Sequence, residues 1–313
     1  MTAAIATLVL VTIGVAYLAV VDRVARSFVA GAPVGLATLA APFRDALRDL
    51  MKERRPTERP DPVMWLGAPI LLVTLVFAAL TVMPLSGEAV GSDLSVGVVF
   101  FTAMFALIMV AAWAAGWGPN SKYPLIAGYR FIGLMLAYEM PFAITIIAVA
   151  LPAESLALGK IVAWQQAHVW NVILQPVGFL IYLVSALAVA FSGPFALLAS
   201  KDLAGGVELE LSGGPRLLWR FGHRALLLST AAFAVPLFLG GGAGPFLPPE
   251  VWTVLKVLFV AGTLALTGHL MPLVRLDWFM KTAWVVLIPL ALVNLFLVGA
   301  VALLFPAWFG SGG

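Results

Sequence analysis

Long apolar runs follow one another along this sequence, and they constrain its fold more than any other feature. A helix of about 20 apolar residues crosses the hydrocarbon layer of a membrane. Eight runs reach or approach that length: Ala3–Val21, Met64–Leu85, Val96–Trp117, Gly128–Leu151, Val172–Leu198, Ala225–Leu239, Val251–Met271 and Thr282–Phe305. Only 11% of the residues are charged, against roughly 25% in soluble domains. We therefore predict an all-α polytopic membrane protein with about eight transmembrane helices, forming one membrane domain over residues 1–313.

The first and the sixth of these apolar runs differ from the others. A cleaved signal peptide carries basic residues before its apolar segment, whereas Arg23 and Arg26 follow the first run. We therefore expect Ala3–Val21 to be a retained span. The run Ala225–Leu239 is the shortest of the eight, and it borders the glycine-rich stretch at residues 239–245. We expect it to form the shortest span.

Basic residues gather in alternate loops. With eight spans, the loops after the first, third, fifth and seventh spans share one side of the membrane. They hold sixteen of the eighteen lysines and arginines, and only Lys160 and Lys256 lie elsewhere. Such an excess is typical of cytoplasmic loops. We predict a multi-pass protein of the cell's inner (plasma) membrane with these loops in the cytoplasm and both termini outside. The net charge of +3 then reflects topology, and no nucleic-acid partner is expected.

The first of these loops contains a helical pattern of its own. Between Leu36 and Glu53, apolar residues recur at helical spacing and charged residues occupy the other positions. This pattern predicts a cytoplasmic amphipathic helix after the first span, with Pro42 near its start or at a kink. Two interpretations stay open. The helix lies on the lipid surface, or it walls a cavity beneath a partner protein.

Several kinds of chemistry are missing from the sequence. The absence of cysteine excludes iron–sulfur clusters, thiolate zinc sites and cysteine nucleophiles. His168, His223 and His269 lie far apart and share no metal-binding motif, and no GxxxxGK[ST] phosphate loop occurs. We therefore expect no metal and no cofactor bound by the chain itself, and no independent catalysis. The lack of an evident internal repeat argues against a stand-alone transporter built from inverted halves.

Glu139 is the one acidic residue within the apolar run Gly128–Leu151. An ionised acid at bilayer depth is unfavourable, so its carboxyl should face other helices or water. Ionisable residues inside membranes commonly serve a function, which favours a proton relay that Tyr138 extends. The alternative is a protonated carboxyl hydrogen-bonded to one neighbouring helix. His269, near the end of the seventh run, is expected to be a neutral imidazole with satisfied hydrogen bonds.

The segment 116–142 contains a GW pair, an SKY triplet, a spaced arginine and a YE pair. The residues are Gly116, Trp117, Ser121, Lys122, Tyr123, Arg130, Tyr138 and Glu139. This order resembles the most characteristic segment of the H subunit of respiratory complex I, the NADH:quinone oxidoreductase. The stretches 41–47, 161–170, 194–206 and 271–295 are similar to further parts of that family in the same order. The resemblance therefore covers nearly the whole chain.

The resemblance implies a role within a larger assembly. In that family the subunit joins the membrane arm to the peripheral arm, its cytoplasmic loops wall a long quinone cavity, and buried acids couple quinone reduction to proton translocation. The implied partners are other membrane and peripheral subunits, quinone and lipid. The chain would be a non-redox subunit, with quinone as a substrate of the complex and electrons passing through the partners.

The resemblance also implies site residues. Glu139 and Tyr138 are the predicted proton-transfer pair. The residues expected at the cytoplasmic mouth of the quinone chamber or at the docking surface are Asp45, Lys122, Arg130, Asp202, Glu208, Glu210, Arg275 and Asp277. Each of these eight also fits a simpler role, as a charge paired with water or lipid headgroups at a membrane end.

The sequence also departs from the family pattern. Val189 stands in place of a buried glutamate, Ser192 or Gly193 in place of an arginine, and Ala196 in place of an aspartate. His223 lies near the position of another family acid. Losing a buried acid together with its arginine leaves neither charge unpaired, so the chain fits a divergent member. The alternatives are the equivalent subunit of a quinone-independent membrane hydrogenase-type complex, which is related to this family, and a structural scaffold paralogue that has lost pumping.

Overall fold

The computed structural model describes residues 2–53, 56–85 and 94–304. Within these ranges the chain is helical and contains no β-strand. Seven helices are long and apolar enough to cross a membrane: α1 (Thr2–Val29), α3 (Pro62–Leu80), α4 (Gly97–Trp117), α5 (Lys122–Ala150), α9 (Gly213–Phe238), α10 (Pro249–Leu270), and the helical stretch Leu276–Leu304 formed by α11 (Leu276–Thr282), the π-helix η5 (Ala283–Leu287) and α12 (Ile288–Leu304). The shorter apolar helix α8 (Pro176–Val189) corresponds to the fifth predicted span. The prediction of an all-α polytopic membrane protein is confirmed.

The fifth span is shorter than the run Val172–Leu198 predicts. It is divided into the short helix α7 (Asn171–Leu174) and α8, which begins at Pro176 because proline lacks an amide hydrogen and suits the first helical position. Beyond α8, Gly193 has a φ of +59° and comes close to Thr267 of α10. Residues up to Ala199 therefore form the 3₁₀ turns η1 (Gly193–Phe195) and η2 (Leu197–Ala199). Hydropathy alone overlooks these breaks.

The sixth span was predicted as the shortest, at Ala225–Leu239, and that prediction is wrong. The helix α9 begins twelve residues earlier, at Gly213, and it is the most buried of the long helices. Arginines in its first half give this part the composition of a loop. They belong to a helix because acids on other elements pair with them, as described below.

The amphipathic helix is present as α2 (Leu36–Met51), which continues through Pro42. Its apolar side chains point outward, with Phe43 55% and Leu47 62% exposed, whereas Asp49 on the other face is only 3% exposed. The two interpretations of this helix therefore apply to different faces. The apolar face is open for lipid or a partner, and the polar face turns toward the protein.

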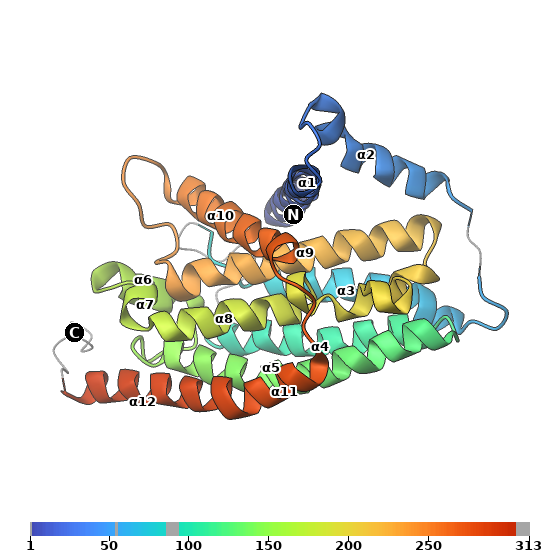
Figure 1. Cartoon of the computed structure of the whole chain (residues 1–313). Coiled ribbons are helices and arrows are strands. Elements are labelled where there is room, and N and C mark those ends of the chain that lie inside the picture. The colour runs from blue at the N-terminus through green and yellow to red at the C-terminus, as the bar shows by residue number, and fades with distance from the viewer. Residues whose placement is uncertain (1, 54–55, 86–93, 305–313) are drawn as a thin grey trace.

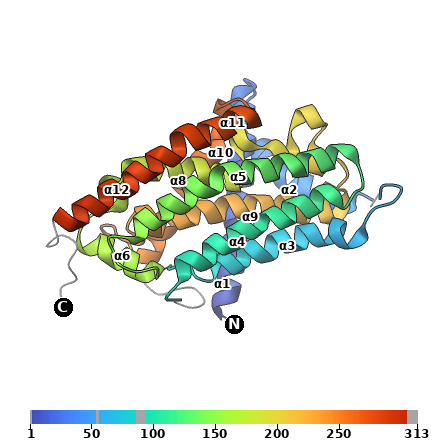
Figure 2. The ribbon, with the colours of Figure 1, turned by 90° about the horizontal axis from the view of Figure 1, so that it is seen from below.

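The helices form a bundle with α9 near its centre (Figure 1). Figure 2 shows α3, α4, α5 and α12 side by side, and each is in contact with the next. On the other side of α9, α1 packs against α2, α9 and α10. In the core, Phe101 of α4 stacks on Phe233 of α9, with 4.1 Å between the two ring centroids. Gly116 lets α4 approach α5 closely, because a Cβ there would lie 2.7 Å from the Pro124 carbonyl.

The four basic loops meet at one end of this bundle. The Asp61 amide donates to the Gly118 carbonyl at 2.8 Å, which joins the first loop to the third. Ser121 donates to Glu210 at 3.0 Å, which joins the third loop to the fifth. The Val274 amide donates to the Pro194 carbonyl at 2.8 Å, which joins the fifth loop to the seventh. The charge pattern predicted that these loops share a side, and their contacts agree with it.

One lysine organises a turn at the opposite end. Lys256 of α10 donates to the carbonyls of Leu239, Gly241 and Ala243 at 2.7–2.8 Å, and its ammonium lies 4.4 Å from the ring centroid of Trp170. These acceptors follow the C-terminal end of α9, where carbonyl groups lack helical partners. A lysine outside the four basic loops is thus satisfied by the backbone.

Candidate functional site: a charged cavity beside the amphipathic helix

A cavity of about 850 Å³ lies between α1, α2, α9 and α10 and is bordered by the 3₁₀ segments that follow α8. Its basic lining residues are Arg23, Arg26, Arg48, Lys52, Lys201, Arg216, Arg220 and Arg224. Its acidic lining residues are Asp22, Asp45, Asp49 and Glu208. Eight basic against four acidic residues leave an excess of four positive charges when the two lining histidines are neutral. The cavity is therefore suited to an acceptor-rich or anionic ligand.

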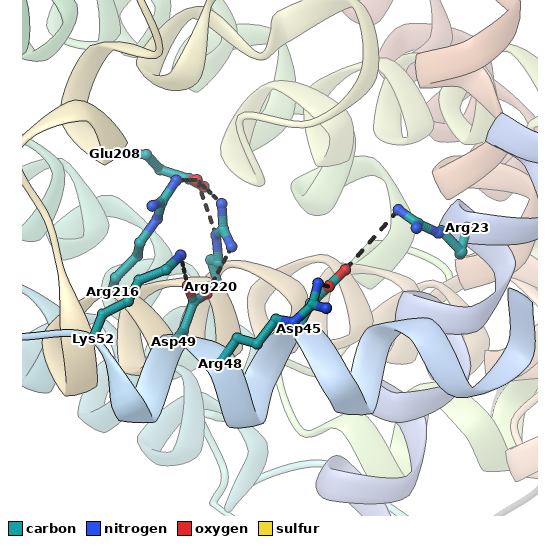
Figure 3. Close-up of polar contacts among 8 residues, drawn as sticks. All are labelled: Arg23, Asp45, Arg48, Asp49, Lys52, Glu208, Arg216 and Arg220. Atoms are coloured by element: carbon teal, nitrogen blue, oxygen red, sulfur yellow. Dashed lines mark hydrogen bonds and ion pairs between the residues drawn. The ribbon is translucent and has the colours of Figure 1, made fainter. Parts of the chain in front are cut away.

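The wall contributed by α9 carries arginines at every fourth position, so Arg216, Arg220 and Arg224 share one helix face. Figure 3 shows Arg220 between two acids from distant parts of the chain. Its Nη1 lies 2.8 Å from Asp49 of α2, and its Nη2 lies 2.9 Å from Glu208 of the 3₁₀ segment η4 (Gly206–Leu209). This arginine therefore ties three elements together at the cavity wall.

Asp49 is the most buried acid of the cavity. Lys52 donates to it at 2.7 Å from one side, and Arg220 does so from the other. Burial alone would raise the pKa of Asp49, but the hydrogen bond from Lys52 and the positive charges of Arg220, Lys52 and Arg216 hold it below its usual value of 3.8. The carboxylate is therefore ionised at neutral pH, and it fixes the polar face of α2 against α9.

Asp45 lies one turn before Asp49 on the same helix, and its contacts are looser. Its carboxylate is 4.0 Å from Arg23 of α1 and 3.7 Å from Arg48, and 45% of its side chain is exposed (Figure 3). Pairs this exposed and this long contribute little to stability. Asp45 therefore leaves the nearby arginines available to other groups in the cavity.

Two histidines line the inner part of the cavity. The His223 Nε2 lies 2.9 Å from the Ser192 Oγ, and the imidazole stacks on Phe191. The His269 Nε2 lies 3.0 Å from Asp22 of α1. The Ser192 hydroxyl and the His223 imidazole thus satisfy each other in the cavity wall. The expectation that His269 has a satisfied imidazole is met by Asp22 as its partner.

Of the predicted chamber and docking residues, Asp45 and Glu208 line the cavity. The others lie outside its lining. Arg130 pairs with Asp202 at 2.6 Å, and Glu210 accepts the hydrogen bond from Ser121. The Lys122 ammonium lies 5.2 Å from the ring centroid of Tyr123. Arg275 and Asp277 pair with each other at 3.7 Å, with 86% and 80% of their side chains exposed.

The predicted relay residues lie on α5, away from the cavity lining. Tyr138 is buried, and its hydroxyl has no hydrogen-bond partner within the described part of the chain. Glu139 is partly buried and forms no hydrogen bond or ion pair with the described residues. Its helix presents Leu136 and Met140, 58% and 51% exposed, on an adjoining face. The helices in the described part of the chain therefore do not provide a hydrogen-bond partner for the carboxyl of Glu139.

Several residues of the cavity wall were predicted from the sequence only as charges in loops. Arg216, Arg220 and Arg224 entered the topology argument, and Asp49 entered the amphipathic pattern, but none was proposed as a site residue. Their four-residue spacing was a usable signal, because three arginines on one helix face rarely point into lipid. The pairing of Asp49 with Arg220 spans 171 residues of sequence, and no local pattern reveals it.

Comparison with known proteins gives consistent matches. The sequence model of the NADH dehydrogenase family matches residues 2–299. The H subunit of the NADH-quinone oxidoreductase of Dehalococcoides mccartyi is 35% identical over 259 residues, which cover 82% of this chain and 72% of that protein. In two strains of Cereibacter sphaeroides, the second H subunit of the NADH-quinone oxidoreductase is 36% and 35% identical over 269 residues, covering 86% of this chain and 82% of each relative.

Proposed function

This chain belongs to the NADH dehydrogenase family, among the H subunits that form part of the complex I membrane arm, and from that premise we propose that its cavity forms the membrane-side wall of a quinone chamber. The observation that carries this proposal is the cavity of about 850 Å³ between the amphipathic helix and α1, α9 and α10. Small-molecule sites commonly measure roughly 300–1,000 Å³. The volume suits a quinone head group with the first part of its tail.

The lining supports an amphipathic ligand. Leu18 of α1, with Leu217 and Leu227 of α9, supplies apolar surface among the charges. A quinone has two carbonyl acceptors on its head group and an apolar tail. Arginines offer several fixed hydrogen-bond donors to such oxygens. The apolar residues pack against the tail. The chain binds no redox group in this proposal, and the electrons reach the quinone from partner subunits.

The end at which the four loops meet is the proposed docking surface for the peripheral subunits. Exposed groups there lie outside the cavity, among them Lys122, the Arg130–Asp202 pair and the Arg275–Asp277 pair. The loops predicted from the sequence hold sixteen of the eighteen basic residues, which supports a cytoplasmic position for this end. In the same topology both termini lie outside the inner (plasma) membrane.

Glu139 and Tyr138 are the proposed proton relay. The carboxyl of Glu139 has no partner among the described residues, so water or another subunit completes its surroundings in the assembly. Inside the bundle, the hydroxyls of Tyr138, Ser185 and Ser229 are buried without hydrogen-bond partners in the described part of the chain. Buried polar groups of this kind commonly bind water. Such water would supply a path for protons to and from Glu139.

A photoreactive quinone analogue tests the chamber. The assembled complex in membrane vesicles is irradiated with the analogue, and labelled peptides are identified by mass spectrometry. We expect labelling of α1, α2 or α9 at the cavity, and loss of that label with excess quinone. Labelling that avoids these helices, combined with NADH oxidation insensitive to quinone-site inhibitors, would contradict the proposal.

The second candidate function is the equivalent subunit of a quinone-independent, hydrogenase-type complex. The observation that favours it is the Ser192–His223 hydrogen bond in the cavity wall. The resembled family carries an arginine at Ser192 or Gly193 and an acid near His223. The same vesicles discriminate between the candidates. Electron transfer that persists after quinone is extracted, and that does not recover further when quinone is restored, supports this candidate.

A further inference from the structure

The three arginines on the cavity face of α9 are unequally paired. Arg220 contacts two acids, as described above. Arg216 reaches Glu208 only at 3.9 Å, and its Nε is buried without an acceptor among the described residues. Arg224, two turns beyond Arg216, lines the cavity and forms no hydrogen bond or ion pair with the described residues. A partly buried guanidinium without an acceptor is unfavourable, so an acceptor from outside the chain is expected at Arg224.

Asp22 and Glu208 attract Arg224 electrostatically, but neither forms a hydrogen bond or ion pair with it within the described part of the chain. On α1, Asp22 accepts from Arg26 and from His269 of α10, and both of its oxygens are occupied. On the 3₁₀ segment, Glu208 is held by Arg220. On α9 itself, the neighbours are the cation Arg220 and the imidazole of His223, which bonds to Ser192. Each of these acids therefore forms its closest ion pair with another cation, Asp22 with Arg26 and Glu208 with Arg220.

The ligand that fits this arginine is a phosphate group. Guanidinium groups bind phosphate through paired, charge-assisted hydrogen bonds. The excess of four positive charges in the lining attracts an anion, and the nearest acids to Arg224 are already paired. The phosphate is expected at the Arg224 end of the arginine row, away from Asp49 and Glu208.

A membrane lipid is the source of phosphate that the surroundings favour. The cavity is bordered by α1 and α2, and Leu18, Leu217 and Leu227 add apolar surface to its lining. A lipid headgroup bound at Arg224 can leave its acyl chains against such surfaces. We propose that the phosphate of an anionic phospholipid binds at Arg224 inside this cavity. The proposal rests on the unpaired arginine and the cavity, and it does not require quinone binding.

The test uses the assembled complex, purified in a neutral detergent and titrated with fluorescent phosphatidylglycerol in mixed micelles. We expect saturable binding that Arg224→Gln weakens about tenfold or more, since a charge-assisted hydrogen bond contributes roughly 1.5–3 kcal/mol. Arg44→Gln is the matched control, since Arg44 is an exposed arginine on α2 outside the cavity lining. It removes the same charge from the same end of the protein and should change binding less than about twofold. Equal weakening by both variants would show general attraction to the surface and overturn the proposal.

A second arm separates the sources of the anion. Inorganic phosphate should compete with phosphatidylglycerol only at high concentration, because it shares the headgroup chemistry and lacks the chains. Tight binding of inorganic phosphate without binding of phosphatidylglycerol would overturn the lipid assignment. If neither inorganic phosphate nor phosphatidylglycerol binds, the lipid assignment is also overturned. That result would indicate that an acidic segment of a partner subunit occupies the site.

A conservative variant covers the case in which Arg224→Gln fails to assemble. Arg224→Lys keeps the positive charge and loses the paired donors. We expect it to bind phosphatidylglycerol about three- to tenfold more weakly than the unmodified complex, with Arg44→Lys unchanged. Unchanged binding by Arg224→Lys in an assembled complex would overturn the role of the guanidinium, whatever the outcome with Arg224→Gln.

Discussion

Asp49 at the cavity wall and Glu139 in the middle of α5 are both acids removed from bulk water, and their surroundings differ. Asp49 accepts hydrogen bonds from Lys52 and Arg220, so the chain itself completes its environment. Glu139 has no such partner among the described residues, and an exposed apolar helix face adjoins it. Asp49 is therefore a structural charge, which this chain needs to hold α2 against α9. Glu139 is a functional charge, whose surroundings other subunits or water must complete.

The largest expected effect comes from Glu139→Gln. A positioned acid or base contributes roughly 100-fold or more to a proton-transfer step. We expect proton translocation by the assembled complex to fall about 100-fold, while assembly stays normal because no contact within the described part of the chain is lost. Proton uptake into vesicles per NADH oxidised measures the effect.

Glu154→Gln is the control for that variant. Glu154 is an exposed acid shortly after the end of α5, and its replacement should leave translocation unchanged. Normal translocation by Glu139→Gln as well would favour the scaffold function over the proton relay. Glu139 would then not be a functional charge in contrast to the structural charge of Asp49.

Asp49→Asn should have the next largest effect, on stability. It weakens two charge-assisted hydrogen bonds and leaves Arg220 with Glu208 alone. Hydrogen bonds to charged groups contribute about 1.5–3 kcal/mol, so we expect the free energy of unfolding to fall by about 2 kcal/mol. Thermal unfolding of the purified complex measures it. Asp277→Asn, which removes a highly exposed ion pair, serves as the control and should change stability by less than about 0.5 kcal/mol.

The pH dependence of stability sharpens the same point. The folded-state pKa of Asp49 lies below its usual value. The ionised carboxylate therefore stabilises the fold fully above the unfolded-state pKa of about 4. This stabilisation is lost as the pH falls through the folded-state pKa. We expect Asp49→Asn to lose more stability at about pH 7 than at about pH 3. An equal loss at both values would show that the charge of Asp49 does not stabilise the fold.

The smallest effect is expected for the Arg130–Asp202 pair. Its atoms lie 2.6 Å apart, but half of the aspartate side chain is exposed, and exposed pairs contribute about 0–1 kcal/mol. A double-mutant cycle with Arg130→Gln and Asp202→Asn should give a coupling of about 0.5 kcal/mol in thermal unfolding. A coupling as large as that of Asp49 with Arg220 would remove the contrast between the cavity wall and the outer surface.

The sequence predicted the helices better than it predicted their ends. Hydropathy located the eight long or apolar helices that lie within residues 2–53, 56–85 and 94–304, because crossing a bilayer requires apolar length whatever the packing. It extended the fifth span through Gly193, where the backbone turns, and it cut the sixth at Ala225. The sixth helix reaches back to Gly213 because Asp49 and Glu208 pair with Arg220, and residue type carries no information about a distant partner.

The site was predicted less completely for the same reason. Glu139 and Tyr138 were found because Glu139 is the one acid within an apolar run. The acids after the fifth span were found through resemblance, and the roles of all these residues stay predictions. Of the predicted chamber residues only Asp45 and Glu208 line the cavity. Arg220 and Asp49 were missed as site residues because the pair forms only when α2 folds back onto α9, which a one-dimensional pattern does not express.

The measurement that tests this account most directly asks what lies beside Glu139 in the assembled complex. The chain contains no cysteine, so Met140→Cys gives this chain a single attachment point for a photoreactive maleimide, on the exposed face that adjoins Glu139. We predict a cross-link between this position and another membrane subunit. Adducts with lipid alone, in a complex that assembles fully and translocates protons, would contradict it.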